Sequence, residues 1–122
     1  MKSVKIINTR NPNVLITAQV CDKFITKLMG LMFRKEINPD FGLFFKETSE
    51  SRVNTSIHML FMRFDISVLW LNKDYIVVDK TLAKKWHPFY APRDPAQYTL
   101  ELHPDRLADF SIGDTLEVSD VQ

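Results

Sequence analysis

The chain has 122 residues, of which 45% are hydrophobic, and its 16 basic side chains nearly balance 15 acidic ones. A chain of this length makes one domain with a core large enough to fold without cross-links. We therefore expect residues 1–122 to form a single domain. The net charge of +1 argues against the broad basic surface of a nucleic-acid binder, so no nucleic-acid partner is expected.

Other compositional features exclude further classes of protein. No apolar run approaches the ~20 residues that span a bilayer, and residues 1–10 contain no signal-peptide core. We expect a soluble, cytoplasmic protein with no membrane span. Cys21 is the only cysteine, so no internal disulfide is possible. Three glycines are too few for a glycine-rich phosphate loop.

The first forty residues predict a hairpin followed by a helix. Residues 4–7 and 14–20 have strand character and flank Asn11-Pro12-Asn13, which favours a turn. Residues 23–29 then predict a short amphipathic helix that closes one end of the fold, capped by Asp22 and ended by Gly30. Its apolar face repeats at helical spacing: Cys21, Phe24, Ile25, Leu28 and Met29.

The middle of the chain, residues 54–79, predicts three strands on which the remainder is organised. They cover residues 57–62, 66–71 and 75–81, with a tight hairpin at 72–74. Within the second strand, alternation places Ile66, Val68 and Trp70 on one face and Ser67, Leu69 and Leu71 on the other. Both faces are therefore expected to be covered.

The remaining segments complete a mainly β, β-rich α+β fold. A turn at residues 38–40 leads into a strand at 42–45, and residues 46–52 predict a solvated loop. Residues 82–97 form the longest irregular segment, and a loop of this length usually has a function. Strands at 98–102 and 115–118 flank one or two helical turns at 104–110. We expect a compact, mostly antiparallel barrel or sandwich with one or two short helices.

An ordered set of short motifs resembles the domain-of-unknown-function 192 family over nearly the whole chain. They are Gly30-Leu-Met-Phe-Arg34, Gly42-Leu-Phe-Phe45, Ile57-His-Met59, Phe61-Met-Arg-Phe64, Trp70-Leu71, Trp86, Pro95-Ala96, Tyr98, Leu100-Glu-Leu102 and Ile112-Gly-Asp114. The resemblance implies a small β-rich fold with minor helices and no established activity, cofactor or substrate.

Two positions depart from the family pattern. Asp65-Ile66-Ser67 stands where the family usually has Pro-x-Asp, and Asn72 stands where an acid is common. The family carboxylate is thus absent at position 67, and a mechanism that relies on it does not transfer to this chain.

The sequence favours neither a metal site nor a cofactor. His58, His87 and His103 are far apart and lack the spacing of zinc ligands. Met29, Met32, Met59 and Met62 with His58 could offer soft ligands to Cu(I). Methionines more often fill gaps in a core, which is the interpretation that we favour. A nucleophile at Ser67 or Cys21 has no base at a suitable spacing.

The acid–base candidates are Asp65, Glu101 and His58. For Glu101 we favour a structural ion pair with Arg34 or Arg63. Residues 80–93 mix basic and aromatic side chains, as single-strand nucleic-acid platforms do. The balanced charge and the prolines favour a solvated loop instead.

Two functional hypotheses follow, and the first is preferred because the polar residues form no recognisable catalytic set. In the first, the chain is a non-enzymatic domain that binds a small ligand or a protein, with Trp86 and Tyr90 as one wall of a pocket and a polar floor of His58, Arg34 or Glu101. In the second, it is a small enzyme with a site built from His58, Asp65, Arg34 and Glu101. The oligomeric state is left open.

Overall fold

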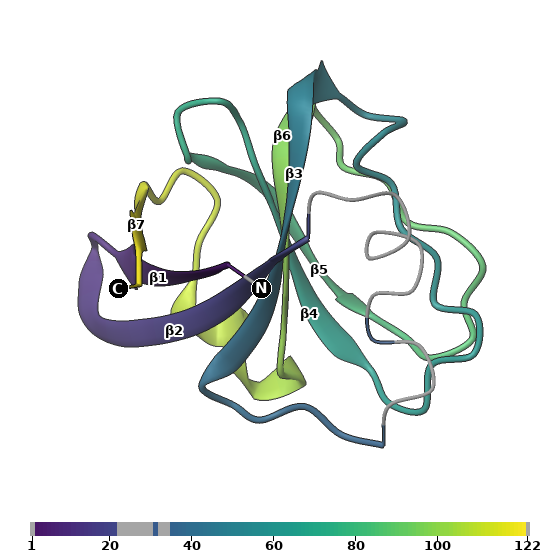
Figure 1. Cartoon of the computed structure of the whole chain (residues 1–122). Helices are drawn as coiled ribbons and strands as arrows, with labels where there is room; N and C mark the ends of the chain where they lie inside the picture. Colours follow the sequence, from purple (N-terminus) through teal and green to yellow (C-terminus); the bar gives the residue numbers. More distant parts are fainter. Residues whose placement is uncertain (1, 22–30, 32–34, 122) are drawn as a thin grey trace.

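A single seven-stranded sheet organises the molecule (Figure 1). The computed structural model describes residues 2–21, 31 and 35–121. Its strands are β1 (Ser3–Asn8), β2 (Asn11–Cys21), β3 (Phe41–Ser51), β4 (Ile66–Leu71), β5 (Val77–Ala83), β6 (Ala96–Leu102) and β7 (Leu116–Asp120). A short 3-10 helix, η1 (Pro104–Asp109), precedes β7. The predicted helical turns at residues 104–110 are therefore confirmed.

The sheet rolls toward a barrel because its two edge strands meet. The strand order is β5-β4-β6-β3-β2-β1-β7, and every pair is antiparallel except β2 with β3. At the edges, Ile76 bridges Thr115, and Leu116 donates its N–H to the Tyr75 carbonyl at 2.9 Å. These contacts confirm the β-rich, mostly antiparallel fold and favour the barrel arrangement.

The two faces of the central strands pack into separate cores. The barrel interior is filled by side chains such as Ile6, Ile16, Phe44, Leu69 and Leu100. The opposite face of β3, β4 and β6 carries a second core, which includes Leu43, Met59, Met62, Val68 and Trp70. All six residues of β4 are buried. The expected division of β4 between two covered faces is thus confirmed.

Buried polar side chains hold the β1–β2 hairpin to the segment before β7. The Asp114 carboxylate accepts bonds from Asn8 Nδ2 at 2.8 Å, Arg10 Nε at 2.7 Å and the Ser111 N–H at 2.8 Å. An ionised carboxylate with three donors is compensated for its burial. This end of the barrel is therefore closed by satisfied polar contacts.

The first hairpin is confirmed, but its turn lies earlier than predicted. Asn8 pairs with Asn11, so Thr9 and Arg10 form the turn. The side chain of Asn8 accepts the Arg10 N–H at 3.2 Å, and such local bonding is the usual reason that asparagine favours turns. The predicted turn residues 11–13 instead extend β2.

The hairpin between β4 and β5 is confirmed, and β5 begins two residues later than predicted. Asn72 Oδ1 accepts the N–H groups of Asp74 and Ile76 at 2.9 and 3.1 Å, which fixes the turn. Tyr75 has a φ of 61°, a left-handed conformation that interrupts an extended strand. Regular pairing therefore resumes at Val77.

Two other predictions from local pattern were wrong. Residues 57–62 form no strand: only Ile57 is bridged, to Tyr90, and Phe61 has a φ of 64°. Conversely, residues 46–51 continue β3 instead of forming a loop, because pairing with β6 is resumed at Ser51 after an irregularity. In both places tertiary pairing outweighed the local side-chain pattern.

Cys21 is the last residue of β2 and is buried in the second core, not on a helix. The predicted helix at residues 23–29 lies outside the described residues.

Candidate interaction surface

Five large apolar side chains are exposed on two neighbouring loops. One of them, Val53, lies near the start of the first loop, and we call the other four the apolar patch. The exposed fractions are 37% for Leu60, 45% for Phe61, 56% for Trp86 and 59% for Phe89. The rings of Phe61 and Trp86 meet edge to face with centroids 5.2 Å apart. Single exposed apolar residues are common on proteins, whereas a cluster of large ones is typical of interaction sites.

The backbone at the centre of the apolar patch is strained. Phe61 and Trp86 have φ values of 64° and 67°. For bulky side chains this left-handed conformation is unfavourable by about 1–3 kcal/mol, and it persists only where the surroundings hold it. Strain of this kind is concentrated at functional sites, so the outlier itself points to this surface.

Backbone hydrogen bonds join the two loops, residues 52–65 and 84–95, into one unit. Ile57 and Tyr90 exchange two N–H···O bonds of 2.9 Å. Met59 donates to the His87 carbonyl at 2.9 Å, and Trp86 donates to the Met59 carbonyl at 2.7 Å. In Figure 1 the two loops run side by side away from β7 and the chain ends. The backbone under the patch is thus paired as in a short, irregular ribbon.

Side chains fix the start of loop 84–95. Asp65 accepts the Lys85 N–H at 2.8 Å and lies 3.4 Å from Lys84 Nζ. The bond from the Lys85 N–H lowers the pKa of the Asp65 carboxyl, and Lys84 adds to the effect. The Tyr90 hydroxyl accepts the Lys84 N–H at 2.9 Å. Asp65 and Tyr90 therefore position the turn that carries Trp86.

The second core supports loop 52–65 from below. Met59 and Met62 are buried in this core, which is where the two described methionines of the copper hypothesis are found. Trp70 is only 1% exposed, and its indole Nε1–H donates to the Thr55 carbonyl at 2.7 Å. A buried indole needs such a partner. Trp70 thereby links β4 to the loop that carries Leu60 and Phe61.

Glu101 is a buried carboxylate in apolar surroundings. Its neighbours across the sheet are Leu43 on β3 and Val68 on β4, both buried. Burial raises the pKa of Glu101 to about 7. No cation among the described residues forms an ion pair with it, and Arg63, one of the two predicted partners, is exposed. The other, Arg34, lies outside the described residues.

The other predicted site residues are placed as follows. Trp86 lies in the apolar patch, and the Tyr90 ring packs on the second core. His58 is half-buried in loop 52–65, and its Nδ1 accepts the Leu60 N–H at 3.3 Å. The paired loops thus carry Trp86, Tyr90 and His58, whereas Glu101 lies on the sheet.

Three members of the patch, Leu60, Phe61 and Phe89, were not among the site residues predicted from the sequence. Leu60 and Phe61 were assigned to a strand, where an apolar side chain is expected to be buried. No periodicity distinguishes them from core residues; only the dense apolar run around Phe61 and the isolated Phe89 between Pro88 and Tyr90 were signals.

Within the described residues, no three His, Cys, Asp or Glu side chains gather as a metal site. The part of the chain that the structure describes also contains no helix with the length and apolar character to cross a membrane.

Curated relatives with similar sequences are uncharacterised proteins. A UPF0127 protein of Pyrococcus furiosus is 43% identical over 93 residues, which cover 76% of this chain and 77% of the relative. One from Thermococcus kodakarensis is also 43% identical, over 68% of this chain but only 51% of the relative. This chain thus spans about half the length of some relatives.

Two solved structures share the fold. A candidate transcription regulator of Sinorhizobium meliloti superimposes with a TM-score of 0.82 at 21% identity, over 96% of this chain and 92% of that one. A protein of unknown function from Novosphingobium aromaticivorans gives a TM-score of 0.76 at 18% identity, over 94% and 83%. Similarity at this level of identity concerns the fold alone. The family model DUF192, Uncharacterized ACR, matches residues 5–118, and the chain therefore belongs to this family.

Proposed function

We propose that this chain is a non-enzymatic interaction domain that binds a protein partner through the apolar patch. The observation that carries the proposal is the contact between Phe61 and Trp86, two exposed rings that are both held in a left-handed backbone conformation. Aromatic side chains that are already fixed lose little entropy on binding, and such residues are frequent binding hot spots. The loop pair supplies this preorganisation.

The charge around the patch favours an acidic partner segment. Lys85 precedes Trp86, and Arg63 follows Phe61 by two residues; both are exposed. The two loops contain two acids, Asp65, which pairs with Lys84, and the exposed Asp94. An apolar segment with flanking Asp or Glu would therefore match the patch in polarity and in charge. His58 and Tyr90 contribute as supports of the two loops.

The geometry supports the enzyme hypothesis less well. Asp65 has its carboxylate oxygens on the Lys85 N–H and on Lys84 Nζ, and His58 uses Nδ1 for the Leu60 N–H. Both groups therefore stabilise the conformation of the loops through hydrogen bonds. Glu101 has the raised pKa that a general acid needs, and this one observation favours an enzyme. It stands alone among the described residues, without a second catalytic group bonded to it.

A displayed library of random peptides tests the proposal directly. We expect selection on the intact protein to enrich apolar peptides with acidic flanks. Trp86→Ala should lower the affinity for the enriched peptides about tenfold or more, as expected for a hot spot that contributes over about 1.4 kcal/mol. Burial of Trp86 should also shift its fluorescence to shorter wavelength, whereas Trp70 is already buried.

Leu15→Ala is the matched control, because Leu15 is 46% exposed on β2 outside the patch. Its affinity for the enriched peptides should equal that of the unmodified chain. Failure to enrich any peptide, or equal binding by Trp86→Ala, would contradict the proposal.

A further inference from the structure

A pocket of about 380 Å³ lies between residues 35–39 and the start of η1. Ile37, which is buried, and Phe64 supply apolar walls, and Lys35, Asn38 and His103 supply polar ones. Pockets of 300–1,000 Å³ that combine apolar walls with a few polar groups are typical small-molecule sites. Its lining residues are distinct from those of the apolar patch.

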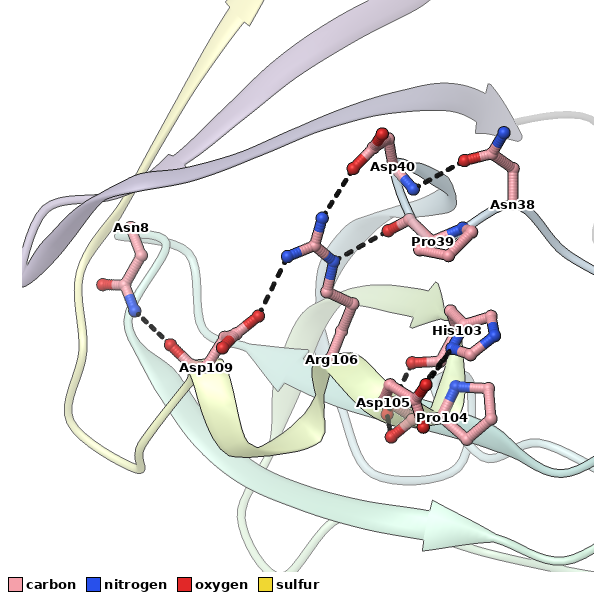
Figure 2. A network of polar contacts seen from close by, with 10 residues as sticks. Asn8, Asn38, Pro39, Asp40, His103, Pro104, Asp105, Arg106 and Asp109 are labelled. Atoms are coloured by element: carbon pink, nitrogen blue, oxygen red, sulfur yellow. Dashed lines mark hydrogen bonds and ion pairs between the residues drawn. The ribbon is translucent and has the colours of Figure 1, made fainter.

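Arg106 holds the two sides of this pocket together. Figure 2 shows its guanidinium reaching from η1 toward Asp40 and Asp109. Nε donates to the Pro39 carbonyl at 2.8 Å, Nη2 lies 2.6 Å from Asp40 Oδ1, and Nη1 lies 3.1 Å from Asp109 Oδ2. The planar guanidinium presents several N–H donors in a fixed geometry, so it can bond to three acceptors at once. The turn that contains Pro39 is therefore fixed against η1 before any ligand binds.

Two polar side chains of the lining, His103 and Asn38, have an acceptor atom already occupied. His103 Nδ1 accepts the Asp105 N–H at 3.0 Å and caps η1, so the neutral ring has its proton on Nε2. Asn38 Oδ1 accepts the Asp40 N–H at 2.8 Å, which leaves the Nδ2 amide as a donor. Lys35 adds an ammonium, and Glu36 is the acid of the lining. Beside His103 and Lys35, a ligand thus meets hydrogen-bond donors.

We propose that this pocket binds a small carboxylate with a flat apolar body. The carboxylate would accept bonds from His103 Nε2–H and Lys35, and the apolar body would lie beside Phe64 and the proline rings. Charge-assisted bonds to carboxylates are among the stronger hydrogen bonds in proteins. This inference goes beyond the interaction domain proposed above and depends on none of the patch residues.

Benzoate and benzamide form a matched pair of probes, because they share a ring and differ in charge. We would titrate each into the isotope-labelled protein at constant ionic strength and follow the backbone amide signals by NMR. Benzoate should shift the signals of Ile37, Phe64 and His103 saturably. Benzamide should bind about tenfold more weakly, as expected for the loss of one charge-assisted bond.

Two substitutions on the pocket rim should act in opposite directions. Lys35→Met retains the apolar stem and removes the ammonium, so benzoate should bind several-fold more weakly. Glu36→Gln removes a repelling charge, so benzoate should bind equally well or more tightly. Lys73→Met is the control, because Lys73 is exposed in the β4–β5 turn outside the lining. It should leave benzoate binding unchanged.

The proposal would be overturned by the absence of a saturable benzoate-induced shift at the lining residues, by equal affinity for benzamide, or by unchanged benzoate binding in Lys35→Met. Phenyl phosphate serves as a third probe. Tighter binding of phenyl phosphate than of benzoate would reject a carboxylate as the preferred ligand.

Discussion

The barrel interior and the loop-covered face of the same strands use similar local features to opposite effect. Tyr75 has the same left-handed backbone as Phe61 and Trp86, but its ring packs inside the barrel, 4.7 Å from Tyr98 and 6.4 Å from Phe44. Burial, with a bond to Tyr75, raises the pKa of the Tyr98 hydroxyl to about 12. Strain at Tyr75 is offset by packing, whereas Phe61 and Trp86 remain exposed.

Buried carboxylates show the same contrast. Asp114 closes the barrel end with three donors on its oxygens. Glu101, on the other face, has apolar neighbours and no ion pair among the described residues. Departures from the rules of stable folding are expected at functional sites. The barrel interior therefore provides stability. The opposite face contains a strained backbone and a buried carboxylate without an ion pair among the described residues, and a binding role would explain both.

The largest expected effect on stability concerns Trp70, which supports the loop-covered face from the second core. Trp70→Ala should lower the free energy of unfolding by about 3–5 kcal/mol, since it leaves a cavity and removes the bond to Thr55. Lys73→Ala, in the exposed turn, should be nearly neutral. Denaturant midpoints of both variants check this expectation. Equal midpoints would mean that Trp70 does not stabilise this face of the sheet.

The next prediction uses the two carboxylates. The pKa of Glu101 rises from an ordinary 4.5 to about 7 on folding. Between these values the native state retains a proton that the unfolded state has released, so stability decreases as the pH rises. The full contribution is present below about pH 4.5, and about 3 kcal/mol is lost by pH 7.

Glu101→Gln should abolish this decrease and make the protein more stable than the unmodified chain above pH 7. Chemical unfolding from pH 4 to pH 8 measures both curves. Asp114 serves as the internal contrast, since its bond to Arg10 holds its pKa below the ordinary value and stabilises the fold at neutral pH. Parallel curves for Glu101→Gln and the unmodified chain would refute the assignment.

A third prediction concerns the strain inside the barrel. Tyr75→Gly relieves a left-handed backbone but removes the ring that contacts Phe44 and Tyr98. Lost packing should exceed the relief, with a net destabilisation of about 2 kcal/mol. Thermal and denaturant unfolding provide the measurement. A gain in stability would show that Tyr75 is not part of the barrel core.

Sequence patterns located the parts of the fold that are set by strand period and turn chemistry. The two faces of β4, the turn at Asn72 and the proline at the start of η1 are local features, and each was predictable. The exposed position of Phe61 was not, because it depends on the bonds of Met59 and Ile57 with a loop some thirty residues away. Lining of the pocket by His103 likewise requires Arg106 to join η1 to Pro39.

The smallest expected effect on stability is the sharpest test of the comparison. Trp86→Gly and Phe61→Gly should each change the free energy of unfolding by less than about 1 kcal/mol, since relief of the left-handed backbone offsets the loss of a half-exposed ring. Either change should nevertheless lower the affinity for the peptides selected on the intact protein. Strained rings that do not stabilise the fold are explained by a role in binding. If Trp86→Gly instead destabilised as strongly as Tyr75→Gly, the patch would be a structural element like the barrel core, and the contrast between the two faces would disappear.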